Sequence, residues 1–403
     1  MVRTRIAPSP TGFPHIGTIY QVLFDYAFAK KNNGKFILRL EDTDRARFVE
    51  GAEDVIYKSL DWFGLIEDES TRKPGDYGPY RQSERLDIYK KYAEELIEKG
   101  HAYYCFCTKE RLETMREEQQ KQKALPMYDK HCRNLPVNEV KVNLDKKLSY
   151  VIRMKVPENR KVIFHDLIIG DIEFDSNTID DQVIFKSDGF PTYHLGVVVD
   201  DHLMEITHIL RGKEWIPSTP KHVLLYEFFG WEMPVHAHLP LILNDKGPGK
   251  LGKRFGHASV DFYRESGFLP EAVLNYLSNI VWNHPDDKEI YSLEEFIDVL
   301  DIEKVTSQGA RFDLQKLTWM NGEYIRALQI TKLKSLIFNF FKGKYTEEFI
   351  GKVVPLVQER IKTLREFDDY CEFFISEPTE YEVDMKEYKD VLEKVHGLLL
   401  EMP

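Results

Sequence analysis

The chain has 403 residues, 42% of them hydrophobic, which indicates a globular protein of two to four domains rather than one compact core. Its formal net charge of −12 argues against a protein that wraps nucleic acid with its whole surface, although a local basic face is compatible with that total. No apolar run approaches the roughly 20 residues of a membrane span, and the N-terminus, MVRTRIAPSPTG, lacks a signal-type apolar segment, so we expect a cytosolic protein.

The first forty residues predict a strand, a turn, a helix and a second strand. RIAP is a short extended segment that ends at Pro8, TIYQVLFDYAFAKKNN carries apolar residues at helical spacing, and KFILRLED is strand-like again. This order favours a parallel sheet whose functional loop follows the first strand. The fold class is therefore predicted to be α/β, with a Rossmann-type nucleotide-binding domain.

The middle of the chain predicts mixed structure and the last third predicts mainly helices. Helices are expected over 53–63, 83–99 and the highly charged 109–125, and β structure is expected from 149 to 201, including the run YHLGVVVDD at 193–201. A helix at 218–231 and a strand at 238–243 follow. Beyond 269 the pattern becomes helical, and the clearest segments are 269–281, 292–300 and 346–367.

The loop SPTGFPHIGT, between the first strand and the first helix, has the composition of an anion site. Gly12 and Gly17 allow the backbone to approach a ligand closely. His15 lies at the start of the helix, where N–H groups and the helix dipole favour a negative charge, and its imidazole can donate to a phosphate oxygen. A proline-rich turn without a ligand would have the same composition.

A second candidate phosphate loop is GKLGKRFGH, residues 249–257, which we name the signature loop. Lys250, Lys253 and Arg254 stand among glycines, directly after the apolar LPLILND. Such a segment is as typical of a solvated surface turn as of a phosphate site. A phosphate role requires that other segments supply a nucleotide site on which this loop can close.

Both loops resemble the two signatures of the class I aminoacyl-tRNA synthetases. His15-Ile16-Gly17-Thr18 is similar to the HIGH signature, and RIAPSPTGFPHIGT resembles the bacterial glutamyl-tRNA synthetases in particular. Lys250-Leu251-Gly252-Lys253-Arg254 aligns with the KMSKR form of the second signature, with Gly252 where Ser is usual. The match is colinear over about residues 1–325 and includes 36–48, 78–103, 187–215 and 218–231.

The resemblance implies an enzyme that joins L-glutamate to ATP as an adenylate, releases pyrophosphate and transfers glutamate to the 3′ end of tRNA-Glu. It implies Mg²⁺ with ATP, although the sequence offers no dedicated carboxylate cage. His15, Gly17, Lys250 and Lys253 are the expected catalytic residues. The expected ATP site is His15, Gly17, Thr18, Glu214, Trp215, Ile242, Lys250 and Lys253.

The family's glutamate-contacting positions correspond to Arg5, Ala7, Ser9, Glu41, Tyr193 and Arg211. A planar guanidinium can bind a carboxylate through two hydrogen bonds. We favour Arg5 for the side-chain carboxylate and Arg211 for the α-carboxylate, with exchanged roles left open, and Glu41 for the ammonium group. The structural alternative is that Glu41 and Arg211 form an internal ion pair.

Three of the four cysteines predict a possible zinc site. Cys105, Cys107 and Cys132 resemble a cluster that some glutamyl-tRNA synthetases carry, and four cysteines are too few for a disulfide framework. The usual fourth position is Asn134, a poor zinc ligand, so Tyr128 or His131 is the candidate fourth ligand. Three reduced cysteines without metal are the alternative.

The resemblance also divides the chain into domains. We expect a catalytic domain in two halves (1–80 and 190–250), an inserted α/β domain for the tRNA acceptor end (81–189), a stem-contact region (251–325) and an all-α anticodon-binding region (326–403), shorter than is usual in the family. Arg360 is the candidate anticodon-reading residue. A monomer is expected.

Four functions are compatible with these motifs. The first is glutamate–tRNA ligation, either strict or with tRNA-Gln charged as well. The paralogue that glutamylates a tRNA base lacks a helical C-terminal region, which this chain has, and a glutaminyl-tRNA synthetase is disfavoured by Arg5 and by the HIGT form. A catalytically inactive tRNA-binding homologue has only Gly252 and the short C-terminal region in its favour, against intact His15, Glu41, Arg211 and Lys253.

Overall fold

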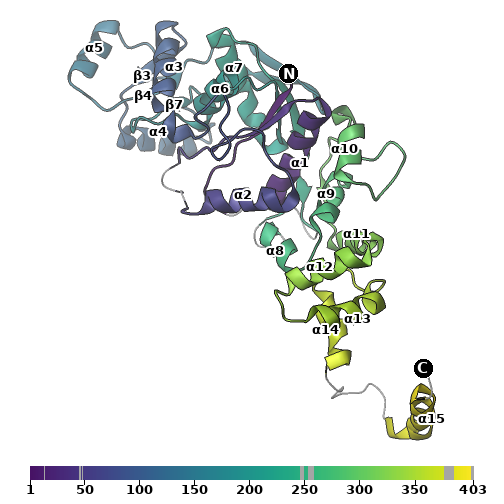
Figure 1. The fold of residues 1–403 in the computed structure, drawn as a ribbon. Helices are drawn as coiled ribbons and strands as arrows, with labels where there is room; N and C mark the ends of the chain where they lie inside the picture. The colour runs from purple at the N-terminus through teal and green to yellow at the C-terminus, as the bar shows by residue number, and fades with distance from the viewer. Residues whose placement is uncertain are drawn as a thin grey trace. The chain divides into compact units, whose positions relative to one another are not determined.

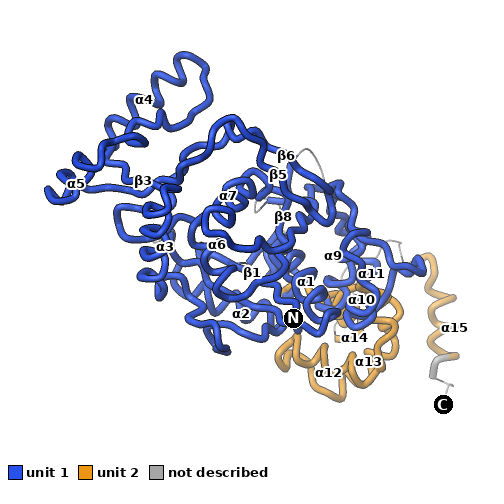
Figure 2. The backbone as a smooth tube through the Cα atoms, turned by 90° about the horizontal axis from the view of Figure 1, so that it is seen from above, with its two compact units in different colours: residues 1–264, 269–320 blue, residues 265–268, 321–403 orange. Residues whose placement is uncertain are grey.

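The computed structural model describes residues 1–12, 14–44, 47, 49–245, 249–252, 258–375 and 385–400. Figure 1 follows the chain from its purple N-terminus to its yellow C-terminus. The described residues form two compact units, coloured blue and orange in Figure 2: residues 1–264 with 269–320, and residues 265–268 with 321–403.

The predicted β–α–β start of the chain is confirmed. β1 (Arg3–Ile6) pairs in parallel with β2 (Lys35–Leu38), and α1 (Ile16–Lys31) connects them. Because α1 packs on β1, β2 and β8, its apolar residues Ile19, Leu23 and Ala27 are almost completely buried. The α/β fold class follows from this unit.

The parallel sheet continues beyond β1 into the middle of the chain. β8 (His208–Gly212) lies beside β1, since the Thr207 N–H donates to the Arg3 carbonyl at 3.0 Å. β8 pairs in parallel with β9 (Val235–Leu239), β9 pairs with β5 (Lys161–Asp166), and β6 (Gly170–Asp175) completes an antiparallel hairpin with β5. This hairpin comes from the range expected for the inserted domain, yet it extends the sheet of the catalytic domain.

Residues 193–201 are helical, so the β structure expected there is wrong. α6 (Tyr193–Leu203) packs against α3 and α7 (Thr219–Phe229), and its Val197, Val198 and Val199 are all buried. A run of β-branched residues is typical of a buried strand, but burial from several sides outweighs that weak local preference. The prediction of a helix over 218–231 is confirmed by α7.

A smaller antiparallel sheet forms a separate layer of the first unit. It consists of β3 (Ala102–Cys105), β4 (Val151–Met154) and β7 (Val183–Phe185), in the order β3-β4-β7. The apolar core beneath it also receives α3 (Leu86–Glu98), α6 and α7. α4 (Lys109–Lys121) and α5 (Val137–Asp145) bury none of their residues, as the charged pattern of 109–125 predicts.

The remaining elements of the first unit include a second short parallel pair. β10 (Ile242–Leu243) pairs with β11 (Ala310–Arg311), which comes much later in the chain. The other helices are α2 (Ala52–Phe63), α8 (Val260–Glu265), α9 (Pro270–Asn279), α10 (Leu293–Val299) and the first half of α11 (Leu314–Ala327), whose residues from 321 on belong to the second unit. The 3-10 turns are η2 (Gln82–Glu84), η3 (Ser176–Thr178), η4 (Lys213–Ser218) and η6 (Ile302–Lys304).

The second unit is helical, as expected for the end of the chain. It contains α12 (Ile330–Phe340), α13 (Glu347–Val357), α14 (Glu366–Ile375), η7 (Met385–Tyr388) and α15 (Lys389–Leu400). The single helix expected over 346–367 is wrong, because the chain leaves the helix after Val357. There the Gln358 amide donates to the carbonyls of Ile325 (3.0 Å) and Leu328 (2.8 Å), which fixes this turn to the end of α11.

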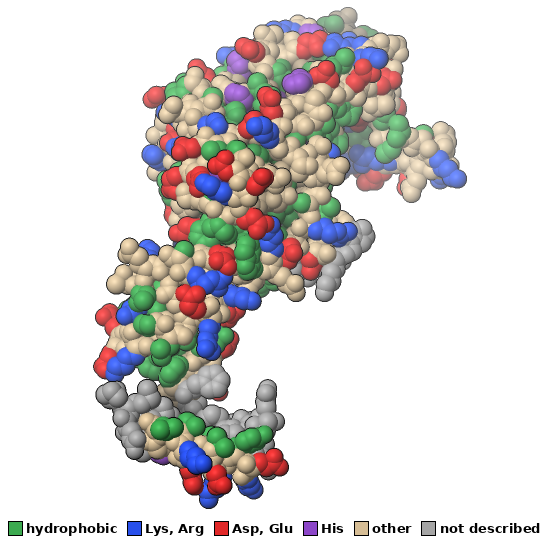
Figure 3. Space-filling model, turned by 90° about the vertical axis from the view of Figure 1, so that its right-hand side faces the viewer, with side chains coloured by type: hydrophobic (Ala, Val, Ile, Leu, Met, Phe, Trp, Pro, Cys, Tyr) green, Lys and Arg blue, Asp and Glu red, His purple; other side chains and the backbone are tan. Residues whose placement is uncertain are grey.

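The surface carries charges of both signs. Figure 3 shows acidic and basic side chains interspersed over one face, without a basic area that dominates it. Within the described part of the chain, no helix is both long and apolar enough to cross a membrane.

Candidate functional site

The candidate site lies where the carboxyl ends of three parallel strands meet. Arg5 is in β1, Arg211 is in β8, and Glu41 follows β2. The two outgoing chains stay side by side, because the Arg39 N–H donates to the Ile6 carbonyl (3.0 Å) and the Glu41 N–H to the Pro8 carbonyl (3.1 Å). This sheet edge is where open α/β sheets bind their ligands. It brings Ala7 and the exposed Ser9 close to Glu41.

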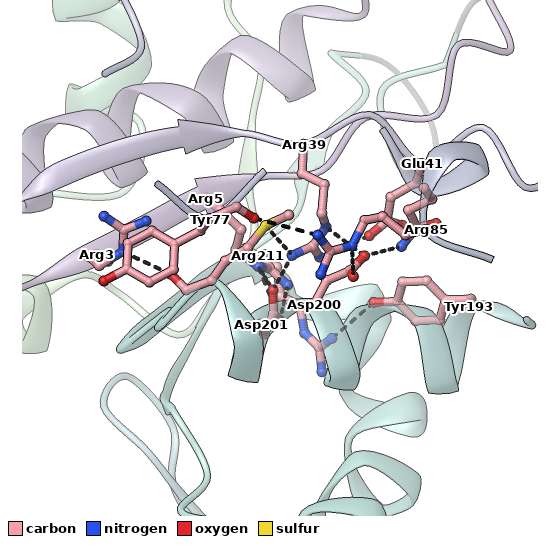
Figure 4. A network of polar contacts seen from close by, with 12 residues as sticks. Arg3, Arg5, Arg39, Glu41, Tyr77, Arg85, Tyr193, Asp200, Asp201 and Arg211 are labelled. Atoms are coloured by element: carbon pink, nitrogen blue, oxygen red, sulfur yellow. Dashed lines mark hydrogen bonds and ion pairs between the residues drawn. The ribbon is translucent and has the colours of Figure 1, made fainter. Parts of the chain in front are cut away.

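A buried carboxylate, Asp201 of α6, neutralises two arginines at this edge. It accepts hydrogen bonds from Arg5 Nε (3.1 Å) and Nη2 (3.1 Å) and from Arg39 Nη1 (2.7 Å), as Figure 4 shows. Burial raises the pKa of Asp201, but the charges of Arg5 and Arg39 outweigh it, so the pKa is lowered. Both guanidiniums therefore already have a carboxylate in direct contact.

The neighbouring Asp200 serves the same purpose for another arginine. It accepts from Arg85 Nε (2.7 Å), from Gln82 Nε2 (2.9 Å) and from the Tyr89 hydroxyl (2.8 Å). Asp200 is completely buried. Asp200 and Asp201, near the end of α6, thus supply the negative charge that neutralises an arginine in β1, one directly after β2 and one directly before α3.

Glu41 pairs with Arg39 and not with Arg211. Its Oε1 accepts from Arg39 Nη2 at 3.0 Å. Burial raises the pKa of the Glu41 carboxyl in spite of that contact. The internal Glu41–Arg211 ion pair considered from the sequence is therefore wrong.

Arg211 is a buried guanidinium that contacts only neutral groups among the residues the structure describes. Its nitrogens donate to the Tyr193 hydroxyl (3.0 Å), to Thr219 Oγ1 (2.7 Å) and to His238 Nε2 (3.1 Å). Burial lowers its pKa. A buried cation without a contacting carboxylate is costly, so the arrangement is suited to an anionic ligand.

An aromatic pair lies beside Arg211. The Tyr193 ring packs against the exposed Trp215 of η4 with 4.7 Å between the ring centroids. Because the same tyrosine hydroxyl accepts from Arg211, this pair connects the arginine with the segment that carries Glu214.

A hollow adjoins α1 and the ends of β8, β9 and β10. It collects His15, Gly17, Glu214, Ile242 and Lys250, five of the positions expected at the ATP site, but its lining does not include Thr18 or Trp215. Sequence reasoning missed the other lining residues, for which adjacency to the two signatures was the only signal: Tyr20, Gln21, Gly212, Leu239, Pro240, Leu241 and Leu251.

His15 caps α1 with its side chain. Its Nδ1 accepts from the Gly17 N–H at 3.0 Å, so the proton of the neutral ring is on Nε2. The imidazole can thus donate from Nε2 while Nδ1 fixes the start of the helix. An N–H donor at a helix N-terminus suits a phosphate oxygen.

The described part of the signature loop, residues 249–252, is attached to β10. The Leu251 N–H donates to the Ile242 carbonyl (2.9 Å) and the Asn244 N–H to the Gly249 carbonyl (3.0 Å). Lys250 forms an ion pair with Glu214 across the hollow. Lys253 and Arg254 lie outside the described residues, and the phosphate role of Lys253 stays a prediction.

The three cysteines come together as predicted. Their sulfur atoms lie within 4.8 Å of one another, with 3.6 Å between Cys107 and Cys132. The Tyr128 hydroxyl lies 3.3 Å from both Cys105 and Cys107. A tetrahedral zinc ion with bonds of about 2.3 Å to sulfur would separate two sulfurs by roughly 3.8 Å, so this group fits zinc with Tyr128 as the fourth ligand. His131 is exposed.

One predicted residue lies in the second unit. Arg360 is exposed in the turn that follows α13, in a hollow that it shares with Lys362, Glu366, Asp369 and Tyr370. Nothing in that unit identifies a base-reading role for it, and that role stays a prediction.

Sequence reasoning missed the charges and neutral groups that hold the arginines. These are Arg39, Asp200, Asp201, Thr219 and His238. Two adjacent acids at the end of the apolar run VVVDD were the one available signal, since an acid beside a buried run needs a buried partner.

Comparison with known proteins identifies two family models along the chain. Residues 1–319 match the class I (E and Q) tRNA synthetase catalytic domain, and residues 326–402 match an anticodon binding domain. A glutamate–tRNA ligase of Fusobacterium nucleatum is 46% identical over 98% of this chain and 81% of its own length. One of a Marinomonas species is 49% identical over 93% of this chain and 75% of its own length.

Solved structures give the same result. A glutamate tRNA ligase of Elizabethkingia meningosepticum, determined in complex with its amino acid, has a TM-score of 0.89 and 40% identity over 96% of this chain and 82% of its own. The glutamate–tRNA synthetase of Elizabethkingia anophelis has a TM-score of 0.91 and 39% identity over 100% of this chain and 87% of its own.

Proposed function

The chain belongs to the glutamate–tRNA ligases, class I tRNA synthetases with a Rossmann-like catalytic domain and a helical anticodon-binding domain, and from this premise we propose how its own residues bind glutamate, ATP and tRNA. One observation carries the proposal. Arg211 is a buried guanidinium whose contacts are all neutral, next to a hollow that collects five expected ATP-site residues.

The side-chain carboxylate of glutamate binds Arg211 and the Tyr193 hydroxyl. The sequence favoured Arg5 for this role, but Arg5 and Arg39 share Asp201, whereas Arg211 contacts no carboxylate within the described ranges. The exchanged roles are therefore better supported. Glutamine would leave the buried charge of Arg211 without an anion, which disfavours it as a substrate.

The other groups of glutamate bind closer to the strand ends. Glu41, with Ala7 and Ser9 beside it, is suited to the ammonium group, because its carboxylate has only one described arginine contact. Arg5 stiffens this edge and contributes positive potential for the reacting α-carboxylate. That carboxylate must stay near the hollow lined by His15 and Gly17 in order to reach ATP.

Adenylate formation is a displacement at the α-phosphate of ATP. A carboxylate oxygen of glutamate forms the new bond to phosphorus while the bond to the bridging oxygen of pyrophosphate breaks. The His15 Nε2–H and the N-terminus of α1 stabilise phosphate charge on one side, and Lys250 and Lys253 do so from the signature loop. Mg²⁺ bound to ATP would reduce the negative charge of its phosphates.

The second step transfers glutamate to the 3′ end of tRNA-Glu. The region 81–189 is proposed to hold the acceptor end, 251–325 the stem and 326–403, with Arg360, the anticodon. The match of residues 326–402 to an anticodon binding domain supports the last of these. The domain boundaries, the monomeric state and the cytosolic location stay predictions from the sequence.

Zinc is proposed at Cys105, Cys107, Cys132 and Tyr128. When bound, the ion would crosslink β3 to the segment after α4. Metal analysis of the purified protein should give one zinc per chain, and none after Cys107→Ser.

A charging assay tests the proposed function. Purified protein should attach glutamate to tRNA-Glu, and a second assay with tRNA-Gln decides whether the enzyme is strict. Lys253→Ala should slow pyrophosphate exchange about 100-fold, whereas Lys352→Ala, at an exposed position of α13, should not. Absence of both exchange and charging would support an inactive tRNA-binding homologue instead.

A further inference from the structure

A chain of buried polar contacts leads from Arg211 away from the pocket. Arg211 Nε donates to His238 Nε2 (3.1 Å), and the other nitrogen of that ring, Nδ1, lies 2.6 Å from Asp166 Oδ2. Their exposed fractions are 2% for Arg211 and 0% for His238 and Asp166. The chain crosses from β8 through β9 to β5.

The charge states along this chain follow from the hydrogen bonds. Asp166 Oδ1 accepts from the N–H groups of Ile168 and Ile169, and Oδ2 accepts from both the backbone N–H and Nδ1 of His238. Burial raises the pKa of Asp166, but the His238 bonds outweigh it and the pKa is lowered. Burial lowers the pKa of His238. Asp166 is therefore a carboxylate and His238 a neutral ring with its proton on Nδ1.

This proton position determines what His238 offers to Arg211. With the proton on Nδ1, the lone pair of Nε2 faces the Arg211 Nε–H and can accept from it. With the proton on Nε2, two N–H groups would face each other and the contact would be lost. The negative charge of Asp166 thus acts on Arg211 through one neutral ring, which fixes the guanidinium without neutralising it by direct contact.

We propose that Asp166, acting through His238, is a positioning residue for glutamate: it fixes the orientation in which Arg211 receives the side-chain carboxylate of the substrate. This inference rests on the proposed role of Arg211. It also gives the β5–β6 hairpin a function, because the hairpin carries into the catalytic sheet a carboxylate that the amino-acid pocket needs.

The same hairpin provides a matched control. His165 Nδ1 lies 2.7 Å from Asp171 Oδ1, one residue before Asp166 in the strand, and those side chains are 66% and 78% exposed. This second histidine–aspartate pair has the same chemistry and also uses a residue of β5, but it joins β5 to β6 and not to β9, and it has no described contact with the pocket. An effect that follows mutation of the buried pair, and not mutation of the exposed pair, is therefore attributed to the contact with Arg211.

The first experiment measures pyrophosphate exchange in the presence of tRNA-Glu. In Asp166→Asn the negative charge is lost. An amide NH2 at the Oδ2 position gives up the bond from the His238 backbone N–H and donates to His238 Nδ1, which moves the proton to Nε2. The KM for glutamate should then rise about 10- to 30-fold, while the KM for ATP and kcat change less than 3-fold. Asp171→Asn should leave all three constants unchanged. An unchanged KM for glutamate in Asp166→Asn, or an equal rise for ATP together with a lower melting temperature, would overturn the proposal.

A double-mutant cycle separates the tautomer effect from a loss of packing. In His238→Gln the amide oxygen can accept from Arg211 without help from Asp166, so adding Asp166→Asn to this variant should raise the KM for glutamate less than 3-fold further. Equal effects of Asp166→Asn in both backgrounds would refute the route through His238. Arg211→Lys is measured in parallel: if it leaves the KM for glutamate unchanged, the proposed role of Arg211 itself fails.

Discussion

Two arginines of the proposed amino-acid pocket are equally buried and differ in the groups that they contact. Arg5 is 3% exposed and contacts the Asp201 carboxylate with two of its nitrogens, while Arg211 is 2% exposed and contacts a tyrosine, a threonine and two histidines, His238 and His222. Figure 4 shows both. A buried arginine that contacts a carboxylate is neutralised within the protein. A buried arginine with only neutral partners keeps a positive potential that can attract an anionic ligand.

The comparison separates framework from binding function. Arg3, Arg39 and Arg85 resemble Arg5, since each contacts a buried carboxylate: Glu69, Asp201 and Asp200, respectively. Their expected contribution is to stability and to the shape of the sheet edge. The expected contribution of Arg211 is to substrate affinity, and mutation of one residue of each kind tests the distinction.

Loss of Arg211 should give the largest effect. Arg211→Ala removes the charge that receives the substrate carboxylate, so kcat/KM for glutamate in pyrophosphate exchange should fall about 10³-fold. Its melting temperature should not fall in proportion, because a buried cation without a carboxylate is removed. Arg160→Ala, which breaks the exposed pair with Glu227, is the control and should leave activity unchanged. Normal glutamate binding by Arg211→Ala would contradict the proposed difference between Arg211 and Arg5.

Loss of Asp201 should act on stability instead. Asp201→Asn leaves Arg5 and Arg39 buried with no full negative charge between them, which should cost about 3 kcal/mol of unfolding free energy. Urea unfolding measures this cost. Asp61→Asn, at the exposed end of the pair with Arg72, should cost less than about 1 kcal/mol. Equal midpoints for Asp201→Asn and the wild-type protein would contradict the framework role.

Acid should destabilise the folded protein by protonating Glu69, the carboxylate that contacts Arg3. Hydrogen bonds from Arg3, and further from Lys35 and Tyr80, lower the pKa of Glu69 to about 2. A depressed folded-state pKa means that the stabilisation is present above the unfolded pKa of about 4.3 and is lost as the pH falls toward 2.

The size of this acid effect should be about 1–2 kcal/mol between pH 5 and pH 2, after allowance for solvent screening. Unfolding midpoints at pH 5, 4 and 3 measure it, and Glu69→Gln should flatten that part of the profile. An unaltered slope in the variant would show that other carboxylates cause the acid sensitivity.

The smallest effect is expected at Gly252, where no buried charge is involved. Among the described residues, a Cβ at this position would meet only the Lys250 carbonyl, at the ordinary contact distance of 3.7 Å, so Gly252→Ser causes no strain with them. The added hydroxyl restores the usual residue of the signature, and pyrophosphate exchange should stay within about 2-fold of wild type or rise. A loss of tenfold or more would mean that this loop requires glycine.

The sequence predicted the parts of the site that depend on local order. The strand–turn–helix start placed His15 at the N-terminus of α1, the cysteine spacing brought Cys105 and Cys107 to one sulfur cluster, and the position after LPLILND placed Lys250 in the same hollow as His15, where ATP binding stays a proposal. It failed for 193–201, where burial from several sides outweighed the strand preference of the valines.

By itself, the sequence determined the family, the α/β class and the residue types that glutamate and ATP require, because these follow from short segments whose spacing is set by the backbone. Only the tertiary structure decided which arginine already contacts a carboxylate and which contacts only neutral groups among the described residues. The physical reason is that charge compensation acts between side chains in contact: Asp201 lies 196 residues from Arg5, and Asp166 reaches Arg211 only through a histidine of a third strand.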